Sequence, residues 1–292
     1  MNIFPYILAA RPKTLPAAIV PVWLGCVLSW HLTGSFDGLI AFYTLMGAIW
    51  IQIGTNFFND AIDADKGADT DKRLGPIRAT ASGLISRKVV YFSALICLLM
   101  ATVFGYLLFL ERGWMVMMIG IPSLYLCYGY TGGPWPLAYK GLGEIFVILF
   151  FGVVAVAGTV FMQLGEWRIE AILLGLQAGL LSAVLISVNN LRDREEDTSS
   201  NKRTLAVILG EKVAKSIVIV EIFLPSVLGL IWLWQGAGLS LVVIPLVYLM
   251  IAVPLTRGIL KEKPSVVYNK YLALGGLQLI VFGIAFHLAA LL

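Results

Sequence analysis

The chain has 292 residues, of which 59% are hydrophobic and only 13% are charged. A soluble domain carries about 25% charged residues, so this composition excludes a soluble globular enzyme. The formal net charge of +4 does not indicate a nucleic-acid partner, because membrane proteins are generally basic on their cytoplasmic side. We expect the lipid bilayer to be a partner and nucleic acid not to be one.

Nine long apolar runs account for most of the sequence. A helix that crosses a bilayer needs about 20 apolar residues. Runs near this length, bounded by charged residues or by glycine and proline, cover residues 15–31, 38–58, 89–110, 114–130, 142–162, 169–190, 213–234, 239–256 and 271–291. The sequence therefore predicts an all-α, polytopic membrane protein with nine transmembrane helices, forming a single integral-membrane domain over residues 1–292.

Connections between successive membrane helices lie alternately on the two sides of the membrane, and the basic residues are distributed very unequally between these sides. Nineteen of the 21 Lys and Arg residues share the side of the N-terminus, and only Arg112 and Arg168 fall on the other. Because cytoplasmic loops are enriched in Lys and Arg, we predict a cytoplasmic N-terminus and a location in the bacterial inner (cytoplasmic) membrane. The two long loops, 59–88 and 191–215, then lie on the cytoplasmic side and are expected to carry the active site.

A polar stripe is predicted where the second apolar run meets the first of these loops. If that helix continues, Gln52, Asn56, Asn59, Asp60 and Asp63 recur at a spacing of three to four residues and lie on one helical face. The stripe combines two carboxylates a turn apart with amide oxygens.

The second long loop repeats this pattern. Asn189, Asp193 and Asp197 are spaced by four residues, again at the cytoplasmic end of an apolar run. Each acidic cluster is followed by a basic pair: Lys72-Arg73 after the first and Lys202-Arg203 after the second.

Two matching acidic clusters on one side of the membrane favour a paired metal site. One such cluster alone is typical of solvated residues at a helix end, but adjacent acids repel each other without a counter-cation. Oxygen ligands suit Mg²⁺, which is commonly shared between carboxylates and a substrate phosphate. We therefore expect two Mg²⁺ ions that bind a diphosphate, and the apolar surroundings indicate a lipid diphosphate.

At this point the residues resemble the UbiA superfamily of intramembrane aromatic prenyltransferases, over essentially the whole chain. Members carry an NDxxDxxxD motif in the first loop and a DxxxD motif in the second. Asn59-Asp60-Ala61-Ile62-Asp63 matches the first motif, but Gly67 replaces its last aspartate and Asp69 follows instead. This departure resembles the branch that prenylates 1,4-dihydroxy-2-naphthoate in menaquinone synthesis, as do residues 67–70, 73–78, 130–134, 139–144, 189–193 and 202–206.

The resemblance implies a fold and a reaction. The fold would be nine helices arranged as two four-helix halves around a central cavity. The reaction would transfer a polyprenyl chain from polyprenyl diphosphate onto 1,4-dihydroxy-2-naphthoate, with loss of CO₂ and diphosphate, to give demethylmenaquinone. The metals would weaken the allylic C–O bond and the electron-rich ring would attack, so that loss of the carboxylate restores aromaticity without a strong base.

The resemblance also implies roles for individual residues. The metal ligands would be Asp60, Asp63, Asp193 and Asp197, with Asn56 and Asp69 as possible further ligands. Lys140 and Tyr139 would join the four aspartates as catalytic residues. Substrate binding would involve Asn56, Asn59, Lys66, Arg73, Arg78, Asn189, Asn190, Arg192, Lys202 and Arg203.

Several residues and alternatives are left open at this stage. The aromatic residues Tyr128, Phe146 and Phe150 could contact a carbocation or simply pack. Glu144 could pair with Lys140, four residues before it. The acceptor could be another aromatic molecule such as 4-hydroxybenzoate, and acids in polytopic proteins also occur in secondary transporters. A transporter site is expected near the midplane, whereas these acids cluster at one membrane face.

Overall fold

The computed structural model describes residues 3–68, 73–236 and 238–292, and within these ranges the chain is helical without strands. The helices follow in this order: α1 (Phe4–Ala10), η1 (Pro12–Thr14), α2 (Pro16–Thr33), α3 (Gly38–Asp65), α4 (Arg87–Arg112), α5 (Met115–Gly129), η2 (Leu137–Tyr139), α6 (Gly143–Val147), the π-helical segment η3 (Ile148–Val154), α7 (Ala155–Leu164), α8 (Ile169–Arg192), α9 (Arg194–Ser199), α10 (Leu205–Gly229), α11 (Ile231–Trp234), α12 (Ser240–Val243), η4 (Ile244–Tyr248), α13 (Leu249–Lys261) and α14 (Tyr268–Ala290).

Across the described ranges, eight helical stretches are long and apolar enough to cross a membrane. Three of them are composite. One consists of α6, η3 and α7, the second of α10 and α11, and the third of α12, η4 and α13. The shorter apolar helix α5 adds a ninth stretch of 15 residues. Each stretch overlaps one of the nine predicted runs, which confirms the prediction of an all-α polytopic membrane protein.

Two helices extend beyond the predicted runs. Helix α3 continues to Asp65, so the first acidic motif is helical as the polar stripe required. Helix α10 begins at Leu205, although the sequence predicted a loop over residues 191–215. That prediction was wrong because Gly210, with φ of 79°, interrupts the apolar pattern while the chain remains helical on both sides of it.

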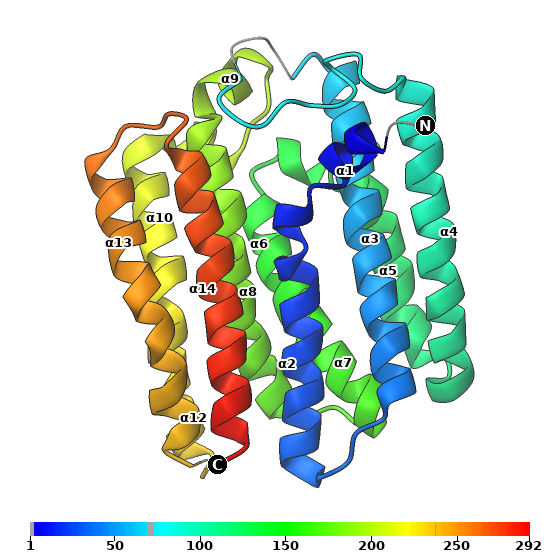
Figure 1. Ribbon diagram of the computed structural model, residues 1–292, viewed down its shortest axis with the longest axis vertical. Helices are drawn as coiled ribbons and strands as arrows, with labels where there is room; N and C mark the ends of the chain where they lie inside the picture. Colours follow the sequence, from blue (N-terminus) through cyan, green and yellow to red (C-terminus); the bar gives the residue numbers. More distant parts are fainter. Residues whose placement is uncertain (1–2, 69–72, 237) are drawn as a thin grey trace.

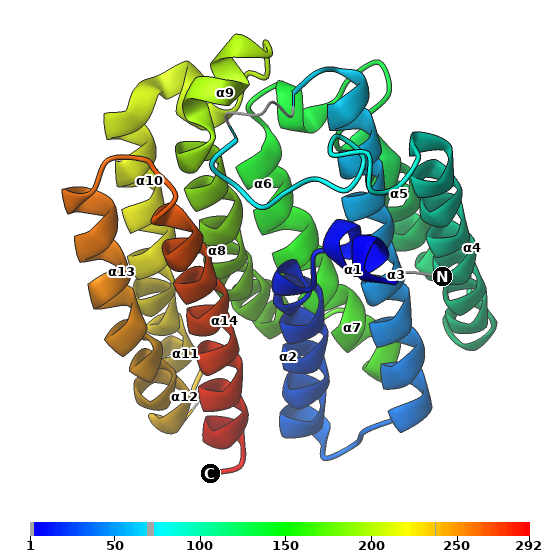
Figure 2. The same cartoon turned by 45° about the horizontal axis from the view of Figure 1, so that its top comes forward.

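The long helices stand side by side and share one loop-rich end (Figure 1). Helix α3 packs against α4, and α8 against α10, while α14 contacts both α2 and α8. The segment that follows α3 and the short helix α9 lie together at the same end of the bundle, near α1 (Figure 2). The two acidic clusters, which end α3 and α8, are thereby brought to one place.

Glycines allow the π-helical segment to lie against α8 at very short range. A Cβ atom on Gly152 would lie 2.3 Å from the Gly175 carbonyl oxygen, and a Cβ atom on Gly179 would lie 2.5 Å from the Ile148 carbonyl oxygen. Small residues of this kind let membrane helices approach closely. The close approach fixes the position of the aromatic residues on η3, which line one of the cavities described next.

Candidate active site

A polar cavity of about 170 Å³ lies between the ends of α3 and α8. Its walls come from the N-terminal segment and from helices α3, α6, α8 and α14. The connections that follow α5 and α9 complete them. The polar residues that line it are Arg11, Thr14, Gln52, Thr55, Asn56, Asn59, Asp63, Arg78, Tyr130, Thr131, Glu144, Ser182, Asn189, Asn190, Lys202 and Thr204. Residues of both predicted clusters therefore meet in one cavity.

Asp63 is the carboxylate of the first cluster that lines this cavity. Tyr139 donates a hydrogen bond from its hydroxyl to Asp63 Oδ1 at 2.8 Å. The Oδ2 atom lies 3.4 Å from Lys202 Nζ and 3.7 Å from Arg78 Nη2. Asn59, one turn earlier, also lines the cavity and is hydrogen-bonded to Thr131. One buried carboxylate thus faces two cations.

Asp60 points elsewhere. Its carboxylate accepts hydrogen bonds from the backbone N–H groups of Ala79, at 3.2 Å, and Thr80, at 2.8 Å. It is 1% exposed and does not line the cavity. In this structure Asp60 attaches the first loop to α3, and its role as a metal ligand stays a prediction.

Gln52 and Asn56 hold the N-terminal segment in place. The side-chain nitrogens of both residues donate to Thr14 Oγ1, at 2.9 and 3.0 Å, and Asn56 also donates to the Ala10 carbonyl at 2.8 Å. The polar stripe on α3 therefore has two roles. Its end near Asp63 faces the other acidic cluster, and its part at Gln52 and Asn56 fixes the segment before α2.

Asp193 of the second cluster is neutralised by arginines. Arg192 forms a bidentate pair with it, with both N–O distances at 2.7 Å, and Arg73 Nη2 lies 3.6 Å from Asp193 Oδ2. Arg192 also donates to Asn189 and Asn269. Asn269 in turn donates to the Leu74 carbonyl at 3.0 Å, which holds the first loop over the end of α8.

Asp197 and Lys202 complete the charged centre. Lys202 Nζ lies 3.8 Å from Asp197 Oδ1 and so stands between carboxylates of both clusters. Burial raises the pKa of the Asp197 carboxyl to about 7, although the Lys202 ammonium acts in the opposite direction. Burial alone would lower the pKa of Lys202, but Asp63 and Asp197 outweigh it and raise that pKa. The centre therefore favours additional positive charge beside Asp197.

The carboxylate and amide side chains at this centre are suitable ligands for a hard divalent cation, but they do not form a complete coordination site. No group of three His, Cys, Asp or Glu side chains among residues 3–68, 73–236 and 238–292 is placed to hold a metal ion. The carboxylates are instead separated by Lys202, Arg73 and Arg78. Carboxylate and amide oxygens are what Mg²⁺ prefers, together with waters and substrate phosphates. A cation at this centre would thus share its ligands with a bound anion.

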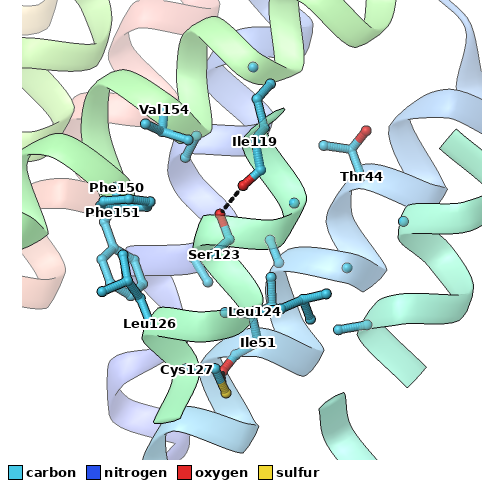
Figure 3. Close-up of a pocket in the computed structure, with 18 of the residues that line it drawn as sticks. Thr44, Ile51, Ile119, Ser123, Leu124, Leu126, Cys127, Phe150, Phe151 and Val154 are labelled. Carbon is cyan, nitrogen blue, oxygen red and sulfur yellow. Dashed lines mark hydrogen bonds between the residues drawn. The ribbon is translucent and has the colours of Figure 1, made fainter. Parts of the chain in front are cut away.

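An apolar cavity of about 210 Å³ adjoins the polar one. Thr55, Tyr130, Val147 and Phe151 line both cavities. Figure 3 shows the apolar cavity between α3, α5 and the π-helical segment, with Phe150, Phe151 and Val154 on one wall and Thr44 on another. Phe146 and Phe150 stack at 5.8 Å between ring centroids and both line it. The combined space suits a molecule with a charged head and a long apolar tail.

Several predicted site residues lie apart from this centre. Lys140 and Arg203 are exposed and line neither cavity, and the Lys140 ammonium lies over the Trp135 ring at 5.1 Å. Lys140 is not paired with Glu144, because α6 begins at Gly143 and Glu144 accepts a hydrogen bond from Asn190 instead. Asp69 lies outside the described residues.

Other predicted residues contribute indirectly. Lys66 donates to the Thr131 carbonyl at 2.8 Å and lies 3.8 Å from the centre of the Tyr139 ring, so it supports the ring that bonds to Asp63. Tyr128 packs edge-on against Phe58 and lines neither cavity.

Seven polar residues of the cavity had no role assigned from the sequence: Arg11, Thr14, Thr55, Tyr130, Thr131, Ser182 and Thr204. From the sequence, Glu144 suggested only a local ion pair. Ser182 does lie seven residues before Asn189 on α8, two helical turns apart and thus on the same face, so its spacing was a usable signal. The N-terminal pair had no such signal, because its position follows from the fold of the segment before α2.

An all-helical membrane bundle with a charged cavity joined to an apolar one defines a membrane protein that binds an amphipathic anion. A model described as the UbiA prenyltransferase family matches residues 18–287 of this chain. The chain belongs to the UbiA prenyltransferase family, as the sequence motifs indicated.

Curated relatives agree with this assignment. A 1,4-dihydroxy-2-naphthoate octaprenyltransferase of Haemophilus influenzae is 36% identical over 208 residues, which cover 69% of this chain and 68% of the relative. The Mycobacterium leprae protein of the same name is 36% identical over 240 residues, 80% of each chain. The Escherichia coli one is 37% identical over 213 residues, 70% of this chain and 68% of the relative.

Solved structures share the fold. A UbiA homologue from Archaeoglobus fulgidus bound to GPP and Mg²⁺ superposes with a TM-score of 0.69 at 17% identity, covering 99% of this chain and 100% of the homologue. The apo structure of a UbiA homologue from Aeropyrum pernix K1 gives a TM-score of 0.70 at 15% identity, covering 98% of each chain.

Proposed function

We propose that this protein transfers a polyprenyl chain from polyprenyl diphosphate to 1,4-dihydroxy-2-naphthoate, releasing CO₂ and diphosphate and forming demethylmenaquinone in its reduced, quinol form. The observation that carries the proposal is the junction of the two cavities: carboxylates and cations of both halves meet at one end, and an apolar space begins beside them. Relatives that are 34–37% identical carry this activity in their names.

The charged centre would hold the diphosphate. Lys202, Arg73 and Arg78 supply positive charge, and the prenyl tail extends along Phe146 and Phe150 in the apolar cavity. Asp63 and Asp197, together with Asn59, Asp193 and the predicted ligand Asp60, are the proposed residues for two Mg²⁺ ions. When bound, these ions stabilise the negative charge that develops on the leaving diphosphate. The A. fulgidus homologue bound to GPP and Mg²⁺ supports this arrangement.

No general base is needed for the transfer. The acceptor binds as a carboxylate and loses that carboxylate as CO₂. The electron pair of the broken C–C bond restores the aromatic ring, and the negative charge ends on the departing diphosphate. The protein has only to orient the ring against the allylic carbon and to keep water away from the cationic centre. The two histidines, His31 and His287, lie in the last turns of α2 and α14 and line neither cavity, and His31 Nδ1 lies 3.0 Å from the Ala290 carbonyl oxygen.

The reaction is tested with purified membranes, a polyprenyl diphosphate and two acceptors supplied separately. We expect dihydroxynaphthoate to be prenylated with release of one CO₂ per product. Prenylation of 4-hydroxybenzoate alone would instead assign the protein to another acceptor. Turnover of neither acceptor, with uptake of a charged solute into vesicles, would indicate a transporter.

The site is proposed to face the cytoplasm, with the N-terminus on the same side. The three native cysteines are buried, so introduced cysteines can be labelled selectively. Arg203→Cys marks the exposed site end, and Trp234→Cys marks a residue that is 91% exposed in α11. An impermeant maleimide should label Cys at position 234 in intact spheroplasts and Cys at position 203 only in inverted vesicles; the reverse pattern would overturn this orientation.

A further inference from the structure

Among the buried oxygen atoms in the polar cavity's walls that lack hydrogen-bond partners within the part of the chain that the structure describes, two belong to a carboxyl or amide group. They are Glu144 Oε2 and Gln52 Oε1. Glu144 is 4% exposed and Gln52 is 7% exposed, and both residues line the cavity. A buried polar group left without a hydrogen-bond partner destabilises the folded protein. Two such groups in one cavity therefore indicate that a ligand completes them.

The neighbouring contacts identify which atom of each side chain is left for a ligand. Asn190 Nδ2 donates to Glu144 Oε1 at 2.8 Å, so the second Glu144 oxygen remains available. Thr14 Oγ1 donates to the Arg11 carbonyl at 3.0 Å, so the Gln52 group that faces Thr14 must be its donor nitrogen. The Gln52 oxygen is then the atom without a partner. Ser182 Oγ and Thr204 Oγ1, also buried and unpartnered, can serve as either donor or acceptor.

Acceptor oxygens are completed by a cation or by a ligand that donates a hydrogen bond. A diphosphate and a carboxylate at neutral pH carry acceptor oxygens only, and a carboxylate beside Glu144 would also be repelled. A prenyl chain carries neither kind of group. Among the substrates of the proposed reaction, only the ring hydroxyl groups of the aromatic acceptor can donate. The apolar lining from Ala17, Val147 and Leu185 is suited to the faces of the ring.

We infer that Glu144 binds the 4-hydroxyl group of the aromatic acceptor and Gln52 the 1-hydroxyl group, with Asn190 holding the Glu144 side chain in position. The 4-hydroxyl is assigned to Glu144 because the 1-hydroxyl lies beside the ring carboxylate, which Glu144 would repel. This inference rests on the proposed function, and it explains how the site would select an acceptor with two hydroxyl groups. Glu144 acts through a hydrogen bond and takes no proton. A hydroxyl held by a carboxylate makes the ring richer in electrons and so favours its attack on the allylic carbon.

Glu144→Gln tests the inference, because glutamine keeps the oxygen that accepts from Asn190 and replaces the other oxygen with a donor. We expect the KM for dihydroxynaphthoate to rise about tenfold or more, which corresponds to about 1.4 kcal/mol. The KM for polyprenyl diphosphate should change less than about twofold. The Ki of 1-hydroxy-2-naphthoate, a competitive ligand without the second hydroxyl, should also change less than about twofold.

Glu221→Gln is the matched control. Glu221 is a second buried carboxylate that bonds to α8, through Ser187 at 2.8 Å, and also has one oxygen without a partner, but it lines neither cavity. We expect its replacement to leave the KM for the acceptor unchanged. An equal rise in both variants, or an equal change for the monohydroxy and dihydroxy ligands in Glu144→Gln, would overturn the inference.

The wild-type protein provides an independent measurement if Glu144→Gln is not recovered in folded form. We expect 1-hydroxy-2-naphthoate to bind at least about tenfold more weakly than the dihydroxy acceptor, and equal binding of the two would contradict the inference. Failure of the wild type to prenylate dihydroxynaphthoate at all would instead contradict the proposed function, so the two failures are distinguishable.

Discussion

Lys202 Nζ lies 3.4 Å from Asp63 Oδ2, although 139 residues separate the two in sequence. The contact joins the acidic motif at the end of α3 to the connection that follows α9. Because Lys202 also lies near Asp197, it is the point at which the two acidic clusters share one cation. In the proposed function, its ammonium would neutralise a diphosphate bound between them.

Lys202→Gln should impair use of the diphosphate substrate. The replacement leaves Asp63 and Asp197 without the cation between them, so we expect kcat/KM for polyprenyl diphosphate to fall by about 100-fold or more, the scale of losing one strong charge contact to a transition state. Lys212→Gln, which alters an exposed lysine on α10, should remain within about twofold of wild type. Comparable losses in both variants would contradict the assignment.

Asp63→Asn should abolish turnover while the protein still inserts and folds, because it removes charge at nearly constant size. Asp65→Asn is the control on the same helix, since Asp65 pairs with Arg87 and Tyr91 outside the cavity. Prenyl transfer and elution on size exclusion are measured for both. Full activity of Asp63→Asn would remove the basis for a metal role.

Asp60→Asn should loosen the first loop. One carboxylate oxygen becomes an N–H₂ group that faces a backbone N–H of Ala79 or Thr80, so one of two buried hydrogen bonds is lost. We expect faster trypsin cleavage after Arg78, and the rate is followed by gel in detergent. Cleavage at the wild-type rate together with loss of Mg²⁺-dependent activity would favour the predicted role of Asp60 as a metal ligand.

Gly152→Ala should destabilise the packing of the π-helical segment on α8. The added methyl would meet the Gly175 carbonyl oxygen at 2.3 Å, and overpacking typically costs about 1–3 kcal/mol. A Cβ on Gly120 has no such atom within 4 Å, so Gly120→Ala should unfold at or above the wild-type temperature. Equal thermal unfolding of the two variants would show that the segment can shift without cost.

Ser123→Leu should shorten the space for the prenyl tail. Ser123 lines the apolar cavity and donates only to the Ile119 carbonyl of its own helix (Figure 3). We expect kcat/KM to fall more for long donors than for geranyl diphosphate, measured across a series of chain lengths. A uniform fall for all donors would place the tail elsewhere.

Much of this arrangement followed from the sequence because membrane helices have a strong local signature. Apolar runs predicted nine helices, and the four-residue spacing of Asn59 and Asp63 predicted that they share a face of α3. The use of Asp60 by the loop could not be predicted, because it depends on the backbone N–H groups of Ala79 and Thr80 that the loop brings near. The pairing of Asp193 with Arg73 could not be predicted either, because it is decided by tertiary contacts between segments far apart in the chain.

Glu144 is a second residue whose contacts could not be predicted from the sequence. Its spacing from Lys140 suggested a local pair, but local spacing matters only within a helix, and α6 begins after Lys140. Its partner is Asn190, 46 residues away. A hydrogen bond across that distance leaves no periodic trace in the sequence.

The separation of Asp63 from Lys202 also sets an order of events during synthesis. At about 5–20 residues per second, the ribosome needs about 7 to 28 s to make the 139 residues between them. The first acidic cluster is therefore made well before Lys202. During that interval it can be neutralised by Arg78 and the other basic residues already made, or by free cations from the surrounding solution.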